Sequence, residues 1–411
     1  MANIRPFRCI RPNKEAAPVV AALPYDVYSR QEAKAVVAKN PQSFLAIDRA
    51  ETQFDDSVDL HDLRVYEKAR TMLNDWIAQG VLLEDEDEVY YIYALTMDGR
   101  TQTGVVACAA VDDYLNGVIK KHENTREDKE QDRICHVDVT NAHTGPIFLA
   151  YRADRSLSKR IAQITAQEAL YDFTAEDGIR HQVWKVADAA DNAFIREHFA
   201  AMDAVYIADG HHRAASAVKV GLRRRAANPG YTGEEPFNYF LSVLFADEEL
   251  MIMPYNRVVQ DLNGLNKKDF LAEVEKRFIV AKAEAPVQPE NSRHIGMYLD
   301  HGWYELAARP EIINDDPVRG LDVSLLQDYL LAPVLGIADP RTDARIQFIG
   351  GIRGLAELER LVDGGQAVAF SMYPTSIAEL FAVADAGLLM PPKSTWFEPK
   401  LRSGLFIHKL V

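Results

Sequence analysis

The sequence has no excess of basic residues, because its 46 lysines and arginines are outnumbered by 61 aspartates and glutamates, and the net charge is −15. Proteins that bind nucleic acids or anionic membranes recruit a basic excess, since binding releases counterions from the phosphates. No DNA-reading helix-turn-helix pattern is evident either. The charge therefore argues against nucleic acid and membrane surfaces as partners.

Cysteine is scarce, and Cys9, Cys108 and Cys135 show no Cys-x-x-Cys spacing. Neither a disulfide framework nor a thiolate zinc site is indicated, a pattern typical of a reducing cytoplasm. The first residues lack the apolar run of a signal peptide, and no stretch approaches the roughly 20 apolar residues of a membrane span. We expect a soluble cytoplasmic protein. The sequence makes no prediction of its oligomeric state.

The order of predicted helices and strands indicates a mixed α/β or α+β fold with several packed units, since single cores stop growing at about 250–300 residues. Apolar positions at helical spacing between residues 61 and 79 mark residues 1–90 as α-rich. Residues 89–95 and 103–111 predict a β-hairpin with a turn at 97–100. We divide the chain into regions 1–90, 91–255 and 256–411.

A strand, a tight turn and a long helix form the most informative segment. The apolar run 204–208 predicts a buried strand and residues 212–225 predict a helix. A helix N-terminus binds anions through unpaired N–H groups, and a glycine permits close approach. Arginine adds a forked donor, and we expect the two histidines to become cationic near neutral pH. The turn consists of Asp209, Gly210, His211, His212 and Arg213.

Asp209 could hold a metal ion or orient a hydroxyl, but simpler interpretations of the turn stay open. Asp209 could serve only as the N-cap of the helix, with Gly210 as a turn residue and the histidines partly exposed. Zinc binding by His211 and His212 is disfavoured, because adjacent side chains on one helix diverge.

A second segment, residues 120–133, is rich in alternating charges and is typical of a solvated helix with ion pairs. It starts directly after an apolar pair, however, and contains His122 and Glu123, a combination able to act as orienter and general base. His136, Asp138 and His143 follow, with a spacing that favours structural or supporting roles over a metal site.

Together, these two segments resemble the free L-serine kinases of the ParB/sulfiredoxin-like superfamily. Those enzymes carry a Lys-Pro-His-Glu segment, in which Lys121 here replaces the proline, and an Asp-Gly-His-His-Arg turn, which is intact here. They end with Pro-Thr, a helix, a glycine and Pro-Lys-Thr-Thr. The same order recurs here as Pro374-Thr375, a predicted helix to Ala386, Gly387 and the segment 392–395. The whole chain is also similar to a long bacterial family of this superfamily, often labelled ParB-like.

The resemblance implies a ParB/sulfiredoxin-like catalytic core in residues 91–255 and a substrate-binding α/β region in residues 256–411. The implied reaction is phosphorylation of free L-serine to O-phospho-L-serine by ATP, ADP or pyrophosphate, with Mg²⁺ as partner of the phosphates. Glu123 would be the base, assisted by His122, and must face a common cleft with the helix start after Asp209. Asp209 would be catalytic and would bind the metal. The implied donor-binding residues are Lys121, Gly210, His211, His212 and Arg213, and the implied substrate-binding residues are Lys393, Ser394 and Thr395.

Alternatives of other classes stay open. No Gly-x-x-x-x-Gly-Lys-Ser/Thr loop occurs, so a P-loop kinase is excluded, and no segment identifies an adenine pocket, which keeps pyrophosphate a candidate donor. A ParB-like regulatory protein would bind and hydrolyse nucleotide without phosphorylating serine. A sulfiredoxin-like redox enzyme would lack its nucleophile, because His211 stands where that cysteine would be.

Overall fold

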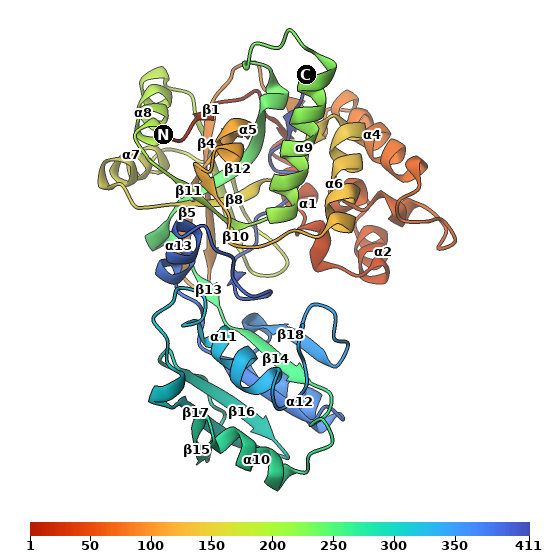
Figure 1. Cartoon of the computed structure of the whole chain (residues 1–411). Coiled ribbons are helices and arrows are strands. Elements are labelled where there is room, and N and C mark those ends of the chain that lie inside the picture. The colour runs from red at the N-terminus through yellow and green to blue at the C-terminus, as the bar shows by residue number, and fades with distance from the viewer. The chain divides into compact units, whose positions relative to one another are not determined.

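The computed structural model describes residues 1–411 and has a mixed α+β fold, which confirms the predicted fold class (Figure 1). The chain forms two compact units. The first unit contains residues 1–250 and 399–411, and the second contains residues 251–398. The last residues thus rejoin the first unit after the chain has completed the second.

The first unit is built on a nine-stranded mixed sheet with the strand order β6-β11-β8-β12-β5-β4-β10-β9, in which β1 also pairs with β5. The pairs β6–β11 and β8–β12 are parallel, and the other pairs are antiparallel. The strands are β1 Ile4–Arg5, β4 Tyr90–Met97, β5 Arg100–Ala110, β6 Ile119–Lys120, β8 Ile147–Tyr151, β9 Tyr171–Thr174, β10 Arg180–Val186, β11 Val205–Asp209 and β12 Tyr239–Ala246.

The predicted hairpin is confirmed as β4 and β5, which pair up to Met97 and Arg100. The two turn residues, Asp98 and Gly99, both have positive φ, of 51° and 79°. Two-residue hairpin loops favour Asp-Gly because their backbone needs this conformation at both positions. The local sequence therefore determines the register of the two central strands.

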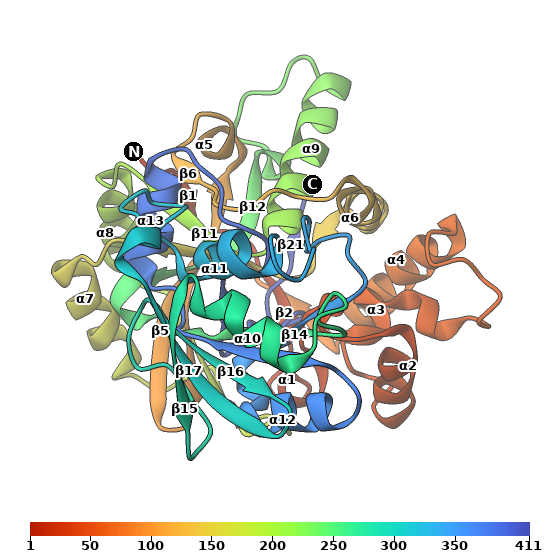
Figure 2. The same cartoon turned by 60° about the horizontal axis from the view of Figure 1, so that its bottom comes forward.

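Alternate residues of the sheet strands pack with helices into one apolar core. Helices α7 Arg155–Thr165, α8 Ala189–Ala200 and α9 His211–Ala227 contribute to this core, and α5 Val111–Leu115 precedes β6. Helix α6 Glu127–Thr140 lies beside α9 (Figures 1 and 2). The predicted helix 212–225 is confirmed as α9, within a few residues at its ends.

Residues 1–90 are α-rich, as predicted, and form most of a second apolar cluster in the first unit, which also includes Ala142 and Ile407. Helix α4 buries Tyr66, Ala69, Leu73 and Trp76, which lie at the helical spacing noted in the sequence, whereas Leu63, its first residue, is 59% exposed. The helices and strands here are β2 Ile10–Pro12, α1 Ala17–Val20, α2 Arg30–Lys39, α3 Leu45–Asp48, α4 Leu63–Ala78 and β3 Leu82–Glu84.

The C-terminal segment 399–411 belongs to the first unit. Its strand β21, His408–Lys409, pairs with β7, Ala142–His143, and Phe406 packs against Tyr91 and Tyr93 of the sheet. The segment also brings Lys400 and Arg402 to this unit. None of these contacts follows from local sequence patterns, since the partners are hundreds of positions apart.

The second unit contains an antiparallel six-stranded sheet with the order β15-β17-β16-β19-β14-β18. Helix α12 packs against it through an apolar cluster. The predicted helix that ends near Ala386 is confirmed as α13. The elements are β13 Ile252–Met253, β14 Tyr255–Val259, α10 Lys267–Glu275, β15 Phe278–Ala283, β16 His294–Leu299, β17 Gly302–Ala308, α11 Asp322–Leu326, β18 Ile346–Gly350, α12 Leu355–Asp363, β19 Val368–Met372, α13 Ile377–Asp385 and β20 Trp396–Phe397.

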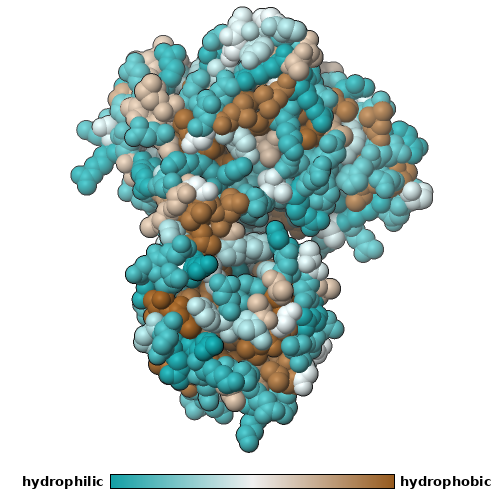
Figure 3. All heavy atoms as spheres, in the orientation of Figure 1, coloured by the Kyte–Doolittle hydropathy of each residue, from teal (hydrophilic) through white to brown (hydrophobic).

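One face of the molecule is mostly polar (Figure 3). Hydrophilic side chains cover most of the face drawn in Figure 3, and apolar side chains form separate patches on it. No helix combines the length and the apolar character that crossing a bilayer requires.

The burial of one histidine, His181, should make the free energy of unfolding depend on pH. His181 contacts the Tyr93 hydroxyl through Nδ1 at 2.7 Å and accepts a hydrogen bond from Arg402 Nε at Nε2, at 3.2 Å. Burial, and then the Arg402 charge, lower the pKa of His181 to about 3. The unfolded chain therefore binds more protons than the folded protein between about pH 6.5 and pH 3.

Stability should accordingly fall as the pH drops below about 6.5, by at most roughly 1.4 kcal/mol per pH unit from this group. Urea denaturation of wild type and His181→Gln from pH 7 to pH 4 measures the effect. The variant should be less stable at pH 7 but should lose stability less steeply on acidification. Parallel profiles for the two proteins would contradict this role of His181.

Candidate functional site

The candidate site lies where two neighbouring parallel strands of the first unit end. Strands β6 and β11 pair with Ile119 opposite Val205 and Lys120 opposite Tyr206. Because parallel strands end at the same edge of a sheet, the residues after β6 meet those after β11. The segment that begins with Lys121 is thereby placed against the start of helix α9.

Three predicted site residues come together at this edge. Ligand atoms of His122, Glu123 and His211 all lie within 4.8 Å of one another. The rings of His122 and His211 stand edge to face with centroids 4.5 Å apart, and both residues are buried. The predicted proximity of the Glu123 carboxylate to the helix start is confirmed, whereas the catalytic roles of these residues stay predictions.

The helix start itself is open to an anion. Gly210, not Asp209, is the N-cap residue of α9, and no side chain caps the helix. The interpretation of Asp209 as N-cap is therefore wrong. Because no side-chain oxygen competes for them, the amides of the first turn are available to a bound anion.

A glycine is favoured at position 210 by the backbone conformation, and not only because it lets a ligand approach the backbone closely. Its φ of 92° and ψ of 32° lie in the left-handed region, and a Cβ added there would meet no atom nearer than 3.7 Å. Space therefore permits a side chain, but the backbone conformation disfavours one. The glycine allows the chain to turn sharply from β11 into α9.

The expected charges of the histidines need correction. Burial, assisted by His122 and other neighbouring groups, lowers the pKa of His211 well below its usual value, and burial lowers the pKa of His122 to about 4. Both rings are therefore neutral near pH 7, and the prediction of a cationic His211 is wrong. Attraction for an anion must come from the helix start and from the lysines and arginine nearby.

His212 holds the loop through a hydrogen bond to its backbone. Its Nε2 accepts a hydrogen bond from the backbone N–H of Arg126 at 3.0 Å, so that nitrogen carries no proton in this arrangement. Glu130 accepts hydrogen bonds from Thr125 and Lys219, and its carbonyl accepts one from Ser216 Oγ at 3.1 Å. These contacts fix the loop against α9.

The charged segment 120–133 is thus only partly helical. Helix α6 begins at Glu127, and the residues between β6 and α6 form the loop that carries His122 and Glu123. The continuous solvated helix that the charge pattern favours is absent from its first half. The charged residue Glu130 of this segment instead holds the loop against α9.

Asp209 is paired with a lysine that the sequence did not reveal. Its Oδ2 accepts a hydrogen bond from Lys400 Nζ at 2.7 Å, and its Oδ1 accepts one from the N–H of Gly210 at 2.8 Å. Burial opposes ionisation, but Lys400 and then Arg213 lower the pKa of Asp209 to about 2. No pattern links the two partners, which stand 191 positions apart.

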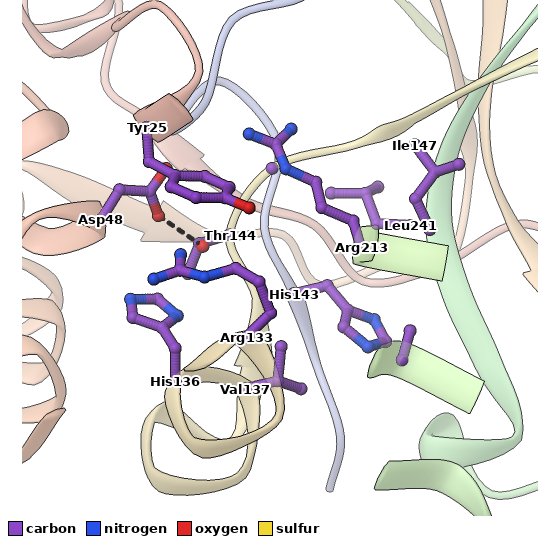
Figure 4. A pocket seen from close by; sticks show the side chains of 12 residues that line it. Tyr25, Asp48, Arg133, His136, Val137, His143, Thr144, Ile147, Arg213 and Leu241 are labelled. Carbon is purple, nitrogen blue, oxygen red and sulfur yellow. Dashed lines mark hydrogen bonds between the residues drawn. The ribbon is translucent and has the colours of Figure 1, made fainter. Parts of the chain in front are cut away.

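A small cavity of about 30 Å³ lies beside Arg213 (Figure 4), enough for one or two water molecules. The guanidinium groups of Arg213 and Arg133 lie over the ring of Tyr25, at 5.3 and 4.0 Å from its centroid. Arg213 Nη1 donates to the carbonyl of Pro146 at 3.3 Å, and its buried Nη2 has no hydrogen-bond partner. The cavity is lined by Tyr25, Asp48, Arg133, His136, Val137, His143, Thr144, Gly145, Ile147, Arg213, Ala217 and Leu241.

Sequence reasoning missed Arg133 and Tyr25. Arg133 closed a run of exposed charges and appeared to be one more surface residue, yet it is 7% exposed. The downstream residues His136 and His143 also line this cavity, and their supporting roles stay a prediction. The only feature of the sequence that could have indicated the burial of Arg133 is its position beside the apolar residues of α6.

The third motif lies in the second unit. Thr375 Oγ1 donates to the carbonyl of Ser394 at 2.9 Å, so the Pro-Thr step and the segment 392–395 are in direct contact. Arg257 Nη2 donates to the carbonyl of Lys393 at 3.0 Å, and Lys393 has a φ of 59°. The assignment of Lys393, Ser394 and Thr395 to substrate binding stays a prediction.

Comparison with known proteins assigns the chain to a family. The chain belongs to the family described as protein of unknown function DUF1015, whose model matches residues 4–324. No curated protein matches the sequence significantly.

Three solved structures are similar over 74% of this chain. They are a free serine kinase in complex with AMP (13% identity, TM-score 0.36, 92% of that chain), SbnI with a C-terminal truncation from Staphylococcus aureus (12%, 0.40, 87%) and a conserved hypothetical protein from Pyrococcus furiosus (14%, 0.36, 95%). Similarity at this level carries no conclusion about activity.

The left-handed conformation of Gly210 predicts an order of stability among variants. Gly210→Ala should lower the free energy of unfolding by about 1–2 kcal/mol, because a Cβ strains this backbone region. Gly210→Asn should cost less, since asparagine tolerates the conformation better. Urea denaturation checks the order, and an alanine variant at least as stable as the asparagine variant would contradict it.

Proposed function

We propose that this protein is a kinase that transfers a phosphoryl group from ATP, ADP or pyrophosphate to the hydroxyl of free L-serine, giving O-phospho-L-serine. The supporting observation is the carboxylate of Glu123 beside the uncapped start of α9. A base and an anion site at one place suit phosphoryl transfer, which depends on positioning and on charge stabilisation.

In the proposed reaction, Glu123 accepts the proton of the serine hydroxyl as its oxygen attacks the terminal phosphorus of the donor. The bond between that phosphorus and the bridging oxygen breaks, and the leaving group is ADP, AMP or phosphate, according to the donor. Glu123 is half-buried beside His122 and His211, which limits access of water to its carboxylate. To act as a general base, the Glu123 carboxylate must lie within hydrogen-bond distance of the serine hydroxyl.

The donor phosphates would bind at the first turn of α9 with Lys121 and Arg213. The buried, unpartnered Nη2 of Arg213 supports this role, because buried donors are nearly always satisfied. Mg²⁺ would accompany the phosphates, with Asp209 as its candidate protein ligand. Each Asp209 oxygen accepts one hydrogen bond and so keeps a lone pair for an ion.

The acceptor assignment to L-serine rests on the motif resemblance. Within the second unit, the hydrogen bond between Thr375 and Ser394 supports it, because it joins the two halves of the third motif. Lys393 is exposed and could pair with a carboxylate or phosphate.

The deciding experiment incubates purified protein with Mg²⁺, L-serine and each donor separately, and detects phosphoserine by mass spectrometry. L-Threonine in place of L-serine tests the acceptor. Absence of phosphoserine with every donor would end the kinase proposal. Serine-independent hydrolysis of nucleotide would instead favour the ParB-like regulatory alternative.

Glu123→Gln should reduce phosphoserine formation roughly 10²-fold or more, as expected for the loss of a general base. Glu127→Gln is the matched control, because Glu127 is an exposed acid four positions away on the same segment. It should retain nearly full turnover. Near-wild-type turnover of Glu123→Gln would assign the base role to another group.

Arg213→Ala should weaken donor binding by about 1.5–3 kcal/mol, the usual contribution of a hydrogen bond to a charged group. Arg223→Ala removes an exposed arginine from the same helix and should leave donor affinity unchanged. Isothermal titration calorimetry with the active donor measures both variants. Equal donor affinities of Arg213→Ala and wild type would remove Arg213 from the binding site.

A further inference from the structure

The cluster of His122, Glu123 and His211 has the composition of a transition-metal site. Two imidazoles and one carboxylate offer ligand atoms that lie within 4.8 Å of one another. They come from the ends of two paired strands, so the sheet fixes their relative positions. The hydrogen bond from Arg126 to His212 further restrains the loop that carries two of them.

The buried nitrogens of this cluster are unsatisfied. His211 Nε2 has no hydrogen-bond partner, and neither ring nitrogen of His122 makes a hydrogen bond of good geometry, although the backbone of Ile207 lies close to that ring. Both residues are more than nine-tenths buried, at 1% and 6% exposure. Because buried polar atoms are almost always paired, the unprotonated ring nitrogen of each neutral histidine calls for a partner, and a bound metal ion would supply one.

The chemistry of the ligand atoms favours a particular class of metal ion. Imidazole nitrogen suits zinc, iron, cobalt and nickel, whereas Mg²⁺ prefers oxygen ligands and retains its waters. An acidic cluster alone would not discriminate, but two histidines in a set of three do. Asp209 is not a member of this cluster, although its negative charge acts on both histidines.

We propose that His122, Glu123 and His211 bind one divalent first-row transition-metal ion, at a site distinct from the Mg²⁺ assigned to Asp209. Three protein ligands leave coordination positions for a phosphate or hydroxyl oxygen. Metal binding does not depend on the proposed kinase function. If both hold, one oxygen of Glu123 binds the ion while the other accepts the proton.

The test uses Co²⁺ as probe on the full chain, freed of metal by a chelator and kept in excess Mg²⁺. Calorimetry and visible absorption should show one Co²⁺ bound per chain, and X-ray absorption of this complex should show two imidazole ligands. Absence of Co²⁺ binding, or its displacement by millimolar Mg²⁺, would overturn the proposal, as would a bound ion without imidazole ligands.

Variants locate the ion. His122→Gln and His211→Gln should each weaken Co²⁺ binding at least 100-fold. His143→Gln should not, because His143 is equally buried and also has unpartnered nitrogens, yet lies outside the cluster. Circular dichroism of the metal-free proteins verifies folding, and unchanged Co²⁺ affinity in both folded cluster variants would contradict the site.

The two proposals can fail separately. Co²⁺ binding is measured without serine or donor, whereas phosphoserine formation is measured with Mg²⁺. Imidazole-ligated Co²⁺ without phosphoserine formation would retain the metal site and reject the kinase. Phosphoserine formation without Co²⁺ binding would do the reverse.

Discussion

The parallel pairing of β6 with β11 is the constraint on which the site depends. A two-residue strand has little stability alone, but here it lies at the edge of a large mixed sheet and is held by the backbone of β11. The pairing brings two loops, some ninety positions apart in the chain, to one edge. Side chains on the β6 loop then face the start of α9, and the contacts between this loop and the helix presuppose this arrangement.

Neutral and positively charged side chains lie at different places in the site. The histidines closest to Glu123 are held neutral by burial, while positive charge resides on Lys121, Arg213 and Lys400 around them. Neutral imidazoles can offer lone pairs, which protonated ones cannot. The site thus combines donors for anions with acceptors for protons or metal ions, a combination that a uniformly cationic turn would lack.

Much of this arrangement could be predicted from local sequence. The β4–β5 hairpin follows from Asp98 and Gly99, and the turn at Gly210 follows from an apolar strand, a glycine and a helical pattern. The proximity of Glu123 to that turn came from a motif resemblance. Lys400 and Arg133 were missed, because their positions depend on contacts that bridge distant parts of the chain. The neutrality of His211 was missed because burial cannot be read from a polar, charged neighbourhood.

The chain order of the two units has a consequence for biosynthesis. Residues 399–411 complete the first unit, yet they leave the ribosome only after the entire second unit has been translated. Until then, the nascent first unit lacks strand β21, the ring of Phe406 on its sheet and the lysine that neutralises Asp209. Assembly of this centre is therefore a late event of translation, and an interrupted chain carries an exposed sheet face and an unpaired carboxylate.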